Sequence, residues 1–480
     1  MFGNSHLKKA FLPVFLVLLL LALQVSATLF DIPGPGGSDE FGSDITVLPN
    51  GNFVVVDPFH DIPGAADVGA VYLYDGQTLN LISVLTGSTA NDRVGSSGIL
   101  VLTDRRYTVI SQTWSGGRGA VTHCENTTGC NGPVTESNSM VGANPGDNVG
   151  NGGAEKLTTG GIVIISFDWF DPVTGARVGA ATYCAPTAPC IGPVSPSNSL
   201  TGMSAGDSDG RYVVALDLGA YAVGSPNHDN SSAPISDVVG SQNRDNSALL
   251  ISDVGAVTWC SGTTGCTGPV TASNSLIGGT QNDRVGGTGI TALSDGSYVV
   301  KSTGWDNPSP LIADVGAATY CSAASPCTGL VTASNSLIGG TATDWVGNGV
   351  TALNDGNYVV SSPIWDNPSP MLQDAGAATF CSSTTPCSGL VTASNSLVGS
   401  TAFEQVGNFG VTALTNGNYV IATPQWDNPS PVRMEAGAAT FCTAAAPCTG
   451  PINSTNSLTG GRANDQVGIG RVTALTNGNY

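Results

Sequence analysis

The sequence predicts an all-β protein, a β-propeller of about seven four-stranded antiparallel blades. Three observations predict it: a repeat of about 60 residues runs through the chain, short strand-like segments recur in every repeat, and no amphipathic helical period follows the first 27 residues. Self-similarity at this period is typical of solenoids, propellers and arrays. Four short antiparallel strands per repeat favour propeller blades over a β-helix, which would have shorter repeats with one parallel strand per face.

A hydrophobic residue followed by glycine marks the start of each repeat. The units begin near residues 41, 94, 149, 209, 285, 346 and 406, with a partial unit from 467. The fourth start, Asp209, is a degenerate copy of the marker, and a small internal duplication lengthens the loop of that unit. We therefore expect residues 28–480 to form one propeller domain with seven complete units.

The sixth unit illustrates the expected fold of one blade. Residues 350–353 predict a first strand, Asp355-Gly356 predicts a tight hairpin turn, and a second strand begins at residue 358. After a Pro-rich loop, residues 376–380 predict a third strand. The Cys-containing loop then makes a second hairpin, and residues 390–393 predict the fourth strand.

The cysteines predict six local disulfides. All twelve follow the first 27 residues and form pairs with five residues between them: Cys124/Cys130, Cys184/Cys190, Cys260/Cys266, Cys321/Cys327, Cys381/Cys387 and Cys442/Cys448. An even number at fixed spacing favours disulfides in an exported chain. Zinc would need closer pairs supplemented by histidines, which are scarce here. Each bridge closes a small loop and contributes about 2 kcal/mol of stability in the chain-entropy model.

Residues 1–27 predict a signal peptide. Lys8 and Lys9 precede an apolar run, and Val25-Ser26-Ala27 supplies the small residues that a signal peptidase needs. The apolar run is too short to span a membrane comfortably, and no later segment is long enough. We expect a secreted or cell-surface protein with no transmembrane segment after the signal peptide.

The charge balance excludes two classes of partner. The chain has 15 Lys+Arg against 35 Asp+Glu, a formal charge of −20, and removing the signal peptide with its two lysines would take this to −22. Such a chain has few cations to neutralise phosphates, so we expect no nucleic acid partner. The same shortage argues against anionic membrane surfaces.

The first unit resembles a known repeat. Residues 40–76, EFGSDITVLPNGNFVVVDPFHDIPGAADVGAVYLYDG, resemble the FG-GAP repeat of integrin-α-like β-propellers, with Phe41-Gly42 at its Phe-Gly and residues 69–74 at its third strand. Later units look like degenerate relatives in bacterial surface and haemagglutinin-like repeat proteins. The resemblance implies a propeller used in adhesion, extracellular scaffolding or some enzymes. Several members bind calcium through a D-x-D-x-D-G loop, of which Asp207-Ser208-Asp209-Gly210 is a fragment. We expect no cofactor, and the alternative is calcium at Asp207 and Asp209.

An acid stands two residues before the marker in every unit. These acids are Asp39, Asp92, Asp147, Asp207, Asp283, Asp344, Glu404 and Asp465. They could form a set of cation ligands, because carboxylate oxygens suit calcium. Alternatively, each could accept backbone N–H groups and fix the turn that enters its blade. One acid per unit, without further ligands at fixed spacing, favours the turn.

A Trp or His in the loop after the second strand is the candidate ligand-binding position. The residues concerned are His60, Trp114, Trp169, His228, Trp305, Trp365 and Trp426. In the later units Asp and Asn follow the Trp, and an exposed Trp beside such groups is typical of a sugar-binding face. The alternative is packing between adjacent blades, which the regular repetition favours. An aromatic residue before the first cysteine of most units is expected to pack against the next blade, and His123 takes this position in the second unit.

The sequence predicts a binding function rather than catalysis. It contains no phosphate-binding loop and no matched nucleophile for its histidines. We expect a non-catalytic recognition or adhesion module that binds an extracellular glycan or protein through its blade loops. Two alternatives are a spacer within a longer extracellular repeat array, and a secreted propeller hydrolase or lyase acting on polysaccharide through paired carboxylates. Asn126, Asn230 and Asn453 begin N-glycosylation sequons.

Overall fold

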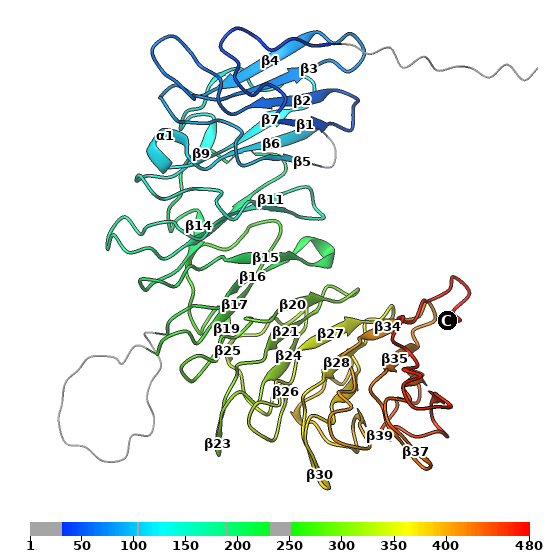
Figure 1. Ribbon diagram of the computed structural model, residues 1–480. Helices are drawn as coiled ribbons and strands as arrows, with labels where there is room; N and C mark the ends of the chain where they lie inside the picture. Colours follow the sequence, from blue (N-terminus) through cyan, green and yellow to red (C-terminus); the bar gives the residue numbers. More distant parts are fainter. Residues whose placement is uncertain (1–30, 103–104, 189, 231–250) are drawn as a thin grey trace, which may run out of the picture. The chain divides into compact units, whose positions relative to one another are not determined.

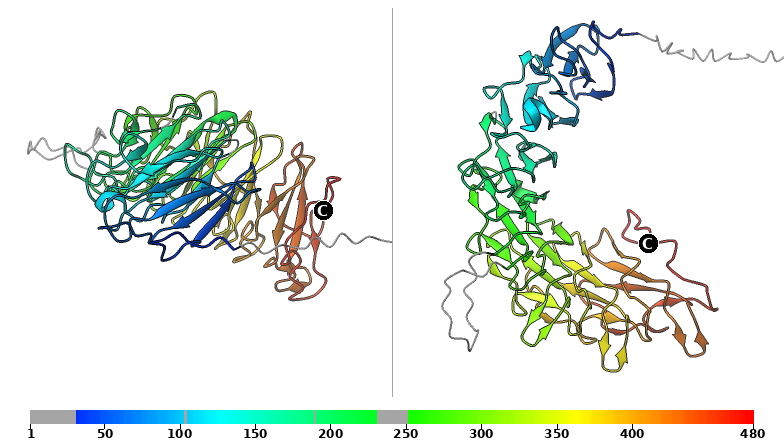
Figure 2. Two further views of the ribbon diagram at one scale, coloured as in Figure 1. Left: turned by 90° about the horizontal axis from the view of Figure 1, so that it is seen from above. Right: turned by 60° about the vertical axis from the view of Figure 1, so that its left-hand side comes forward.

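The computed structural model describes residues 31–102, 105–188, 190–230 and 251–480. The predicted signal peptide lies outside the described residues, as does most of the duplicated loop of the fourth unit. Pro35–Tyr480 forms one compact unit. Its regular structure is almost entirely β (Figures 1 and 2), apart from the short helical segments α1 (Trp114–Gly117) and η1 (Asp217–Gly219). No helix in the described part of the chain is long and apolar enough to cross a membrane.

Each repeat forms one sheet of four antiparallel strands, and these seven sheets are the blades of a β-propeller. The first strands of consecutive blades contact one another from the third blade to the seventh. The first strands are β1 (Asp44–Val47), β5 (Ile99–Val101), β10 (Ala154–Lys156), β15 (Tyr212–Ala215), β20 (Gly289–Ala292), β27 (Gly349–Ala352) and β34 (Val411–Ala413). The second strands are β2 (Phe53–Asp57), β6 (Arg106–Ser111), β11 (Ile162–Ser166), β16 (Tyr221–Ser225), β21 (Tyr298–Ser302), β28 (Tyr358–Ser362) and β35 (Tyr419–Thr423).

The third and fourth strands complete each four-stranded blade. The third strands are β3 (Ala70–Tyr74), β7 (Ala120–Glu125), β12 (Ala180–Cys184), β17 (Ala256–Cys260), β24 (Ala317–Cys321), β31 (Ala377–Cys381) and β38 (Ala438–Cys442). The fourth strands are β4 (Leu81–Thr86), β9 (Ser139–Val141), β14 (Ser199–Thr201), β19 (Ser275–Ile277), β26 (Ser336–Ile338), β33 (Leu397–Val398) and β40 (Leu458–Thr459). The predicted four-stranded repeat is therefore confirmed.

The first two strands of a blade are joined by the predicted tight turn. In the sixth blade the N–H of Leu353 donates to the carbonyl of Asn357 at 2.8 Å, which closes the hairpin around Asp355-Gly356. Gly356 has a φ of 83°, a value that only glycine adopts readily. A residue with a side chain would be strained at this point of the turn, which explains the glycine of the Asp-Gly and Asn-Gly pairs.

The position predicted for the fourth strand is wrong. Residues 390–393 do not form the outer strand of the sixth blade; instead the two-residue strand β32 (Gly389–Leu390) pairs in parallel with β26 of the fifth blade. The chain then turns back, and β33 forms the fourth strand. Six such added strands extend the preceding blade: β8 (Gly132–Pro133), β13 (Gly192–Pro193), β18 (Gly268–Pro269), β25 (Gly329–Leu330), β32, and β39 (Gly450–Pro451).

An asparagine stabilises the turn by which the chain goes from the added strand back to its own blade. The side chain of Asn395 accepts the N–H of Thr392 at 2.9 Å and donates to the carbonyl of Leu390 at 2.9 Å. Ser396 then bonds to both Asn395 and the buried Thr379 of the third strand. The sequence Thr-x-Ser-Asn-Ser that makes these contacts indicates a turn. The apolar residues just before it also fit a strand pattern, which explains the wrong prediction.

All six predicted disulfides are present, each joining cysteines six positions apart. The bonded pairs are Cys124–Cys130, Cys184–Cys190, Cys260–Cys266, Cys321–Cys327, Cys381–Cys387 and Cys442–Cys448. The zinc alternative does not fit these residues, because a sulfur bonded to its neighbour cannot act as a thiolate ligand.

The two cysteines of a bridge lie in different environments, which their identical spacing did not indicate. The first cysteine of each pair is buried in the third strand or directly at its end. The second is only partly buried and lies in the loop that follows, as Cys130, Cys190, Cys266, Cys327, Cys387 and Cys448 all do. Each of these loops leads within two residues to the added strand on the preceding blade. The disulfide therefore links the loop that reaches the preceding blade to the core of its own blade.

The hydrophobic core lies between consecutive blades. Leu293 and Val299 of the fifth blade pack with Tyr358, Val360 and Trp365 of the sixth. The aromatic residue before the first cysteine contacts the next blade, as predicted: Phe380 stacks on Tyr419 with ring centroids 5.8 Å apart. Equivalent stacks join Tyr183 to Tyr221 and Tyr320 to Tyr358.

No strand pairing among the described residues joins the first sheet to the seventh. The seventh sheet consists of four strands from its own repeat. Residues 467–480 cover part of it, because Val467 and Val472 pack against Leu414 and Val420. The aromatic stack between blades also continues here, with Tyr480 on Phe441.

Candidate functional site

The acids before the marker serve as turn caps in six blades. Asp344 accepts the N–H groups of Gly340 and Thr341 at 2.7 and 2.8 Å, and the N–H of Asp366 at 3.0 Å. The hydroxyl of Thr341 also donates to it. Asp92, Asp147, Asp207, Asp283, Asp344 and Glu404 are all buried and make contacts of this kind. Asp39 and Asp465 are exposed. The turn interpretation is confirmed for the six.

The candidate tryptophans lie inside the core. Trp114, Trp169, Trp305, Trp365 and Trp426 are all buried, and each belongs to a hydrophobic cluster shared with the preceding blade. An indole enclosed in this way has no free face for a sugar to stack on. The expectation of a sugar-binding face at these residues is therefore corrected: the alternative, packing between blades, describes them.

The fourth blade departs from this pattern at two positions. Five blades place a fully buried valine at the marker and a tryptophan after the second strand, as Val346 and Trp365 do in the sixth. In the fourth blade the marker is Asp209 and the tryptophan is replaced by His228, and both are buried. An apolar pair has thus been exchanged for an acid and a histidine at the same place in the core.

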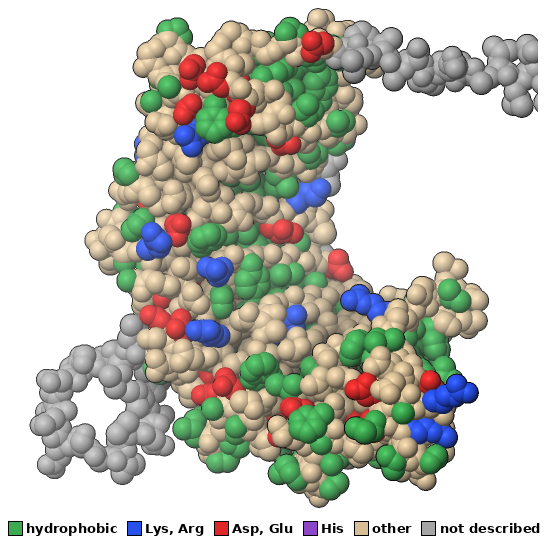
Figure 3. All heavy atoms as spheres, in the orientation of Figure 1, with side chains coloured by type: hydrophobic (Ala, Val, Ile, Leu, Met, Phe, Trp, Pro, Cys, Tyr) green, Lys and Arg blue, Asp and Glu red, His purple; other side chains and the backbone are tan. Residues whose placement is uncertain are grey.

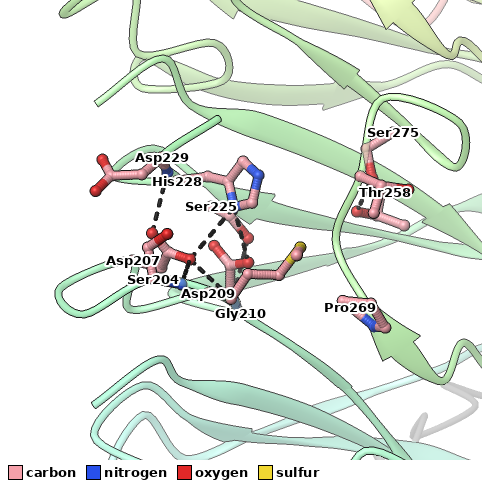
Figure 4. Close-up of polar contacts among 12 residues, drawn as sticks. Ser204, Asp207, Asp209, Gly210, Ser225, His228, Asp229, Thr258, Pro269 and Ser275 are labelled. Atoms are coloured by element: carbon pink, nitrogen blue, oxygen red, sulfur yellow. Dashed lines mark hydrogen bonds and ion pairs between the residues drawn. The ribbon is translucent and has the colours of Figure 1, made fainter. Parts of the chain in front are cut away.

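Asp207, Asp209 and His228 form a compact cluster (Figure 4). Nδ1 of His228 lies 3.1 Å from Oδ2 of Asp209 and 3.7 Å from Oδ2 of Asp207. The other oxygen of Asp209, Oδ1, is buried and has no hydrogen-bond partner. The sequence singled out all three residues, but for two separate reasons, and the structure brings them together.

Burial and mutual repulsion shape the electrostatics of the cluster. Desolvation, followed by the nearby Asp209, raises the pKa of Asp207 to about 6, against the opposing backbone N–H bonds and His228. Burial lowers the pKa of His228, but Asp209 and the neighbouring acids outweigh it, so that this pKa is raised overall. Asp207 therefore exchanges its proton closer to neutral pH than an ordinary aspartate would.

The first blade contains a second His-for-Trp replacement. His60 is also buried, and its Nδ1 lies 3.3 Å from the hydroxyl of Tyr72 and 4.0 Å from Oδ2 of Asp57. Asp57 occupies the position that Ser225 has in the fourth blade, immediately at the end of the second strand. His60 thus lies in the core and does not line a loop surface.

A surface hollow lies between the fifth and sixth repeats. It has a volume of about 510 Å³, and its lining includes Asn282, Arg284, Asp314 and Trp345. Trp345 is 43% exposed, and its backbone N–H donates to the carbonyl of Asp314 at 3.3 Å. Arg284 and Trp345 stand at the same position of consecutive repeats, directly before the marker. A flat aromatic face and a guanidinium thus border one open hollow.

Arg284 differs from its counterpart in the second repeat. Arg93 forms an ion pair with Asp67 at 3.3 Å and lies over the ring of Phe59. Arg284 is exposed and makes no ion pair with any residue the structure describes. Its guanidinium is therefore available to an external acceptor.

Three neighbouring hairpins expose apolar side chains. They are β22–β23 (Asn307–Pro308 with Leu311–Ile312), β29–β30 (Asn367–Pro368 with Met371–Leu372) and β36–β37 (Asn428–Pro429 with Val432–Arg433). Leu311, Met371 and Val432 are 73, 68 and 78% exposed. Figure 3 shows hydrophobic side chains on the surface around these hairpins, with acidic and basic groups between them. Repeated exposure of large apolar groups is typical of a contact surface.

The predicted glycosylation positions have different environments. Asn126 and Asn230 are buried, and Asn453 is partly exposed. Asn126 cannot present its side chain to a glycosyltransferase in this fold, because its loop packs on the first blade, where Asn50 and Asn52 donate to its carbonyl. Because both side chains are buried, the expectation that Asn126 and Asn230 mark surface positions is corrected.

Sequence reasoning missed Arg284 and Trp345. Both precede the marker, where other repeats have Asn148, Ser208, Gln405 and Gln466. This position has a positive φ in every one of these repeats. It is exposed at Arg284 and Trp345 and half-buried in the other four. Its variability between otherwise similar repeats was the available signal.

His123 gives the second blade an acid-sensitive position. Burial, followed by the charge of Arg106, lowers the pKa of His123 to about 4. Its Nδ1 contacts the hydroxyl of Thr108 at 3.0 Å, while Nε2 is buried without a hydrogen-bond partner. The folded protein therefore holds this imidazole neutral below the pH at which an exposed histidine would be protonated.

We expect His123→Phe to flatten the pH dependence of stability. Because the folded pKa is below the unfolded value of about 6.5, this histidine's stabilisation is complete above pH 6.5 and is lost as pH falls toward 4. The variant should reduce the loss of unfolding free energy between pH 7 and 4 by about 1–3 kcal/mol, measured by urea denaturation. Phe380→Tyr, at the same position of the sixth blade, serves as a control and should leave the profile unchanged. An unaltered profile in His123→Phe would contradict the assignment.

Comparison with known proteins identifies the repeat. The pattern of the family described as "Repeat of unknown function (DUF5650)" matches residues 47–96, 101–151, 156–211, 237–287, 292–348, 352–408 and 413–469. No curated protein sequence matches the chain. The repeat matches account for most of its length.

Several solved structures are similar at low identity. Kluyveromyces lactis Hsv2 is 8% identical, with a TM-score of 0.30, and the alignment covers 82% of this chain and 89% of that one. The Dos1 propeller is 11% identical, with a TM-score of 0.33 and 89% of each chain covered. A polysaccharide lyase of a new family, the PL25 ulvan lyase, is 10% identical with a TM-score of 0.28, covering 87% of this chain and 93% of that one. These scores are too low to support any inference about function.

Proposed function

Because the chain belongs to the DUF5650 repeat family, whose function is unknown, we propose a function from its own surface. It is a non-catalytic recognition module, secreted or on the cell surface, that binds a glycan through the loops before its blades. The hollow bordered by Arg284 and Trp345 carries this proposal. Six disulfides support an oxidising, extracellular compartment. Free thiols found by mass spectrometry in protein from its natural source would contradict that location.

The chemistry of the hollow favours a saccharide that carries an acid group. Trp345 offers an apolar face on which a sugar ring can stack. Arg284 offers a guanidinium without an ion-pair partner among the described residues, and such a group binds a carboxylate or sulfate through two parallel hydrogen bonds. Asn282 and Asp314 add hydrogen-bonding groups for hydroxyls. The opening is wide and polar, which suits an extended glycan better than an enclosed small molecule.

Binding to an array of neutral and acidic oligosaccharides tests the proposal. We expect the purified, oxidised protein to bind an acidic class, and Trp345→Gln or Arg284→Gln to weaken that binding at least tenfold, about 1.4 kcal/mol. Glutamine already occupies this position in the next two repeats, as Gln405 and Gln466, so both variants should fold. Gln405→Ala is the matched control and should bind normally.

A protein ligand is the second candidate, supported by the exposed hairpin residues Leu311, Met371 and Val432. A variant with serine at all three positions separates the two proposals. The protein ligand is correct if the serine variant no longer attaches to cells. The glycan proposal fails if, in addition, the wild type binds no glycan and Trp345→Gln has no effect.

We also propose that the first repeat is a divergent FG-GAP repeat. Phe41 supports this, because it replaces the marker valine and packs edge-on against Tyr72 with centroids 5.4 Å apart. An experimental structure in which this blade fails to superpose on an integrin-α blade would reject the kinship.

A further inference from the structure

We propose that Asp207, Asp209 and His228 bind one divalent transition-metal ion, of the Zn²⁺ class, inside the fourth blade. The three side chains offer two carboxylate oxygens and one imidazole nitrogen within 4.8 Å of one another. All three are buried, and no other blade has this combination of side chains in the described part of the chain. The proposal does not depend on the surface hollow or on its ligand.

The spacing of the donor atoms fits a small tetrahedral ion. Bonds of about 2.0–2.1 Å to nitrogen and oxygen place neighbouring ligand atoms about 3.3–3.4 Å apart in a tetrahedron. The observed separations from Nδ1 of His228 are 3.1 Å to Asp209 and 3.7 Å to Asp207, on either side of that value. Small side-chain adjustments would therefore bring all three atoms into the coordination sphere.

The unpaired oxygen of Asp209 is an independent indication of a missing partner. Oδ1 is fully enclosed, yet it receives no hydrogen bond, whereas buried carboxylate oxygens are normally paired. The acids that cap turns in other blades show the contrast, since both oxygens of Asp283 accept hydrogen bonds. A cation beside Asp209 would supply the interaction that the protein itself does not.

Charge and space point in the same direction. Asp209 and His228 replace the apolar marker and tryptophan of five other blades, beside the buried acid Asp207, and burying such charges is costly unless they are paired or bound to a metal. An imidazole is also smaller than the indole it replaces. A nitrogen ligand favours Zn²⁺ or Co²⁺ over Ca²⁺, which takes six to eight oxygens.

The other candidate cluster does not compete with this one. His123 lies near the sulfurs of Cys184 and Cys190, but those two atoms are bonded to each other. Neither can act as a thiolate ligand while the disulfide is intact.

The experiment uses the full, oxidised protein after removal of metal with a chelator. Titration with Co²⁺ is followed by visible absorption, and native mass spectrometry after Zn²⁺ addition gives the stoichiometry. We expect one ion per chain, the absorption bands of a four- or five-coordinate Co²⁺ site, displacement of Co²⁺ by Zn²⁺, and no competition from millimolar Ca²⁺.

The decisive variant restores the core of the other blades. Asp209→Val combined with His228→Trp should weaken Co²⁺ binding at least a hundredfold, while thermal unfolding in chelator stays unchanged or shifts upward. His228→Gln alone provides the same test if the double variant does not fold. His60→Gln, in the other blade with a buried histidine after its second strand, should bind Co²⁺ normally. Absence of Co²⁺ and Zn²⁺ binding in the wild type, binding of Ca²⁺ alone, or full binding by the double variant would each overturn the proposal.

Discussion

Replacing Asp344 with alanine is expected to lower the free energy of unfolding by about 3–4 kcal/mol. This carboxylate accepts three backbone N–H groups and one hydroxyl, and its side chain is fully buried. Alanine would leave those donors without an acceptor and remove the connection between the turn and the residue that follows Trp365. The effect should be measured as a shift in urea midpoint at pH 7.

The next repeat supplies the control for this prediction. Glu404 has the same role there, accepting from Ser400, Thr401 and Asp427. Asp344→Glu should therefore retain most of the stability, within about 1 kcal/mol of the wild type. Equal destabilisation by Ala and Glu would show that space at this position, and not its hydrogen bonds, sets the cost.

Trp365→Ala is expected to cost about 3–5 kcal/mol, because it empties a fully buried indole site between the fifth and sixth blades. The cavity would be shared by both blades, so the loss should broaden as well as lower the unfolding transition. Trp345→Ala is the matched comparison on the surface and should change stability by no more than about 0.5 kcal/mol. If the two variants proved equally stable, the packing assignment would be rejected.

The repeated elements of the fold could be predicted from the sequence, because each is determined by residues close together in the chain. The Asp355-Gly356 turn and the Cys381–Cys387 bridge are examples of such local signals. The added strand β32 could not, because its partner β26 lies in another repeat and two residues carry no strand pattern of their own. The Asn395 turn beside it was the missed signal.

The candidate sites could be predicted only in part, for a different reason. Asp207 and Asp209 are close together in the sequence and are easily noticed. That His228 lies beside them depends on how the strand before His228 packs. The burial of Trp365 could not be inferred, because a repeated Trp-Asp-Asn segment is compatible both with packing between blades and with an exposed binding surface. Arg284 and Trp345 belong to one hollow only because consecutive repeats lie side by side.

The short span of the disulfides has a consequence for how the protein is made. Twelve cysteines could in principle combine in a very large number of ways, and the number rises steeply with each added pair. Here every bonded partner is six positions away. Loops of this length close in well under a microsecond, so each cysteine meets its native partner before any distant one. Correct oxidation can therefore proceed repeat by repeat while the chain is still being synthesised, without waiting for neighbouring blades to assemble.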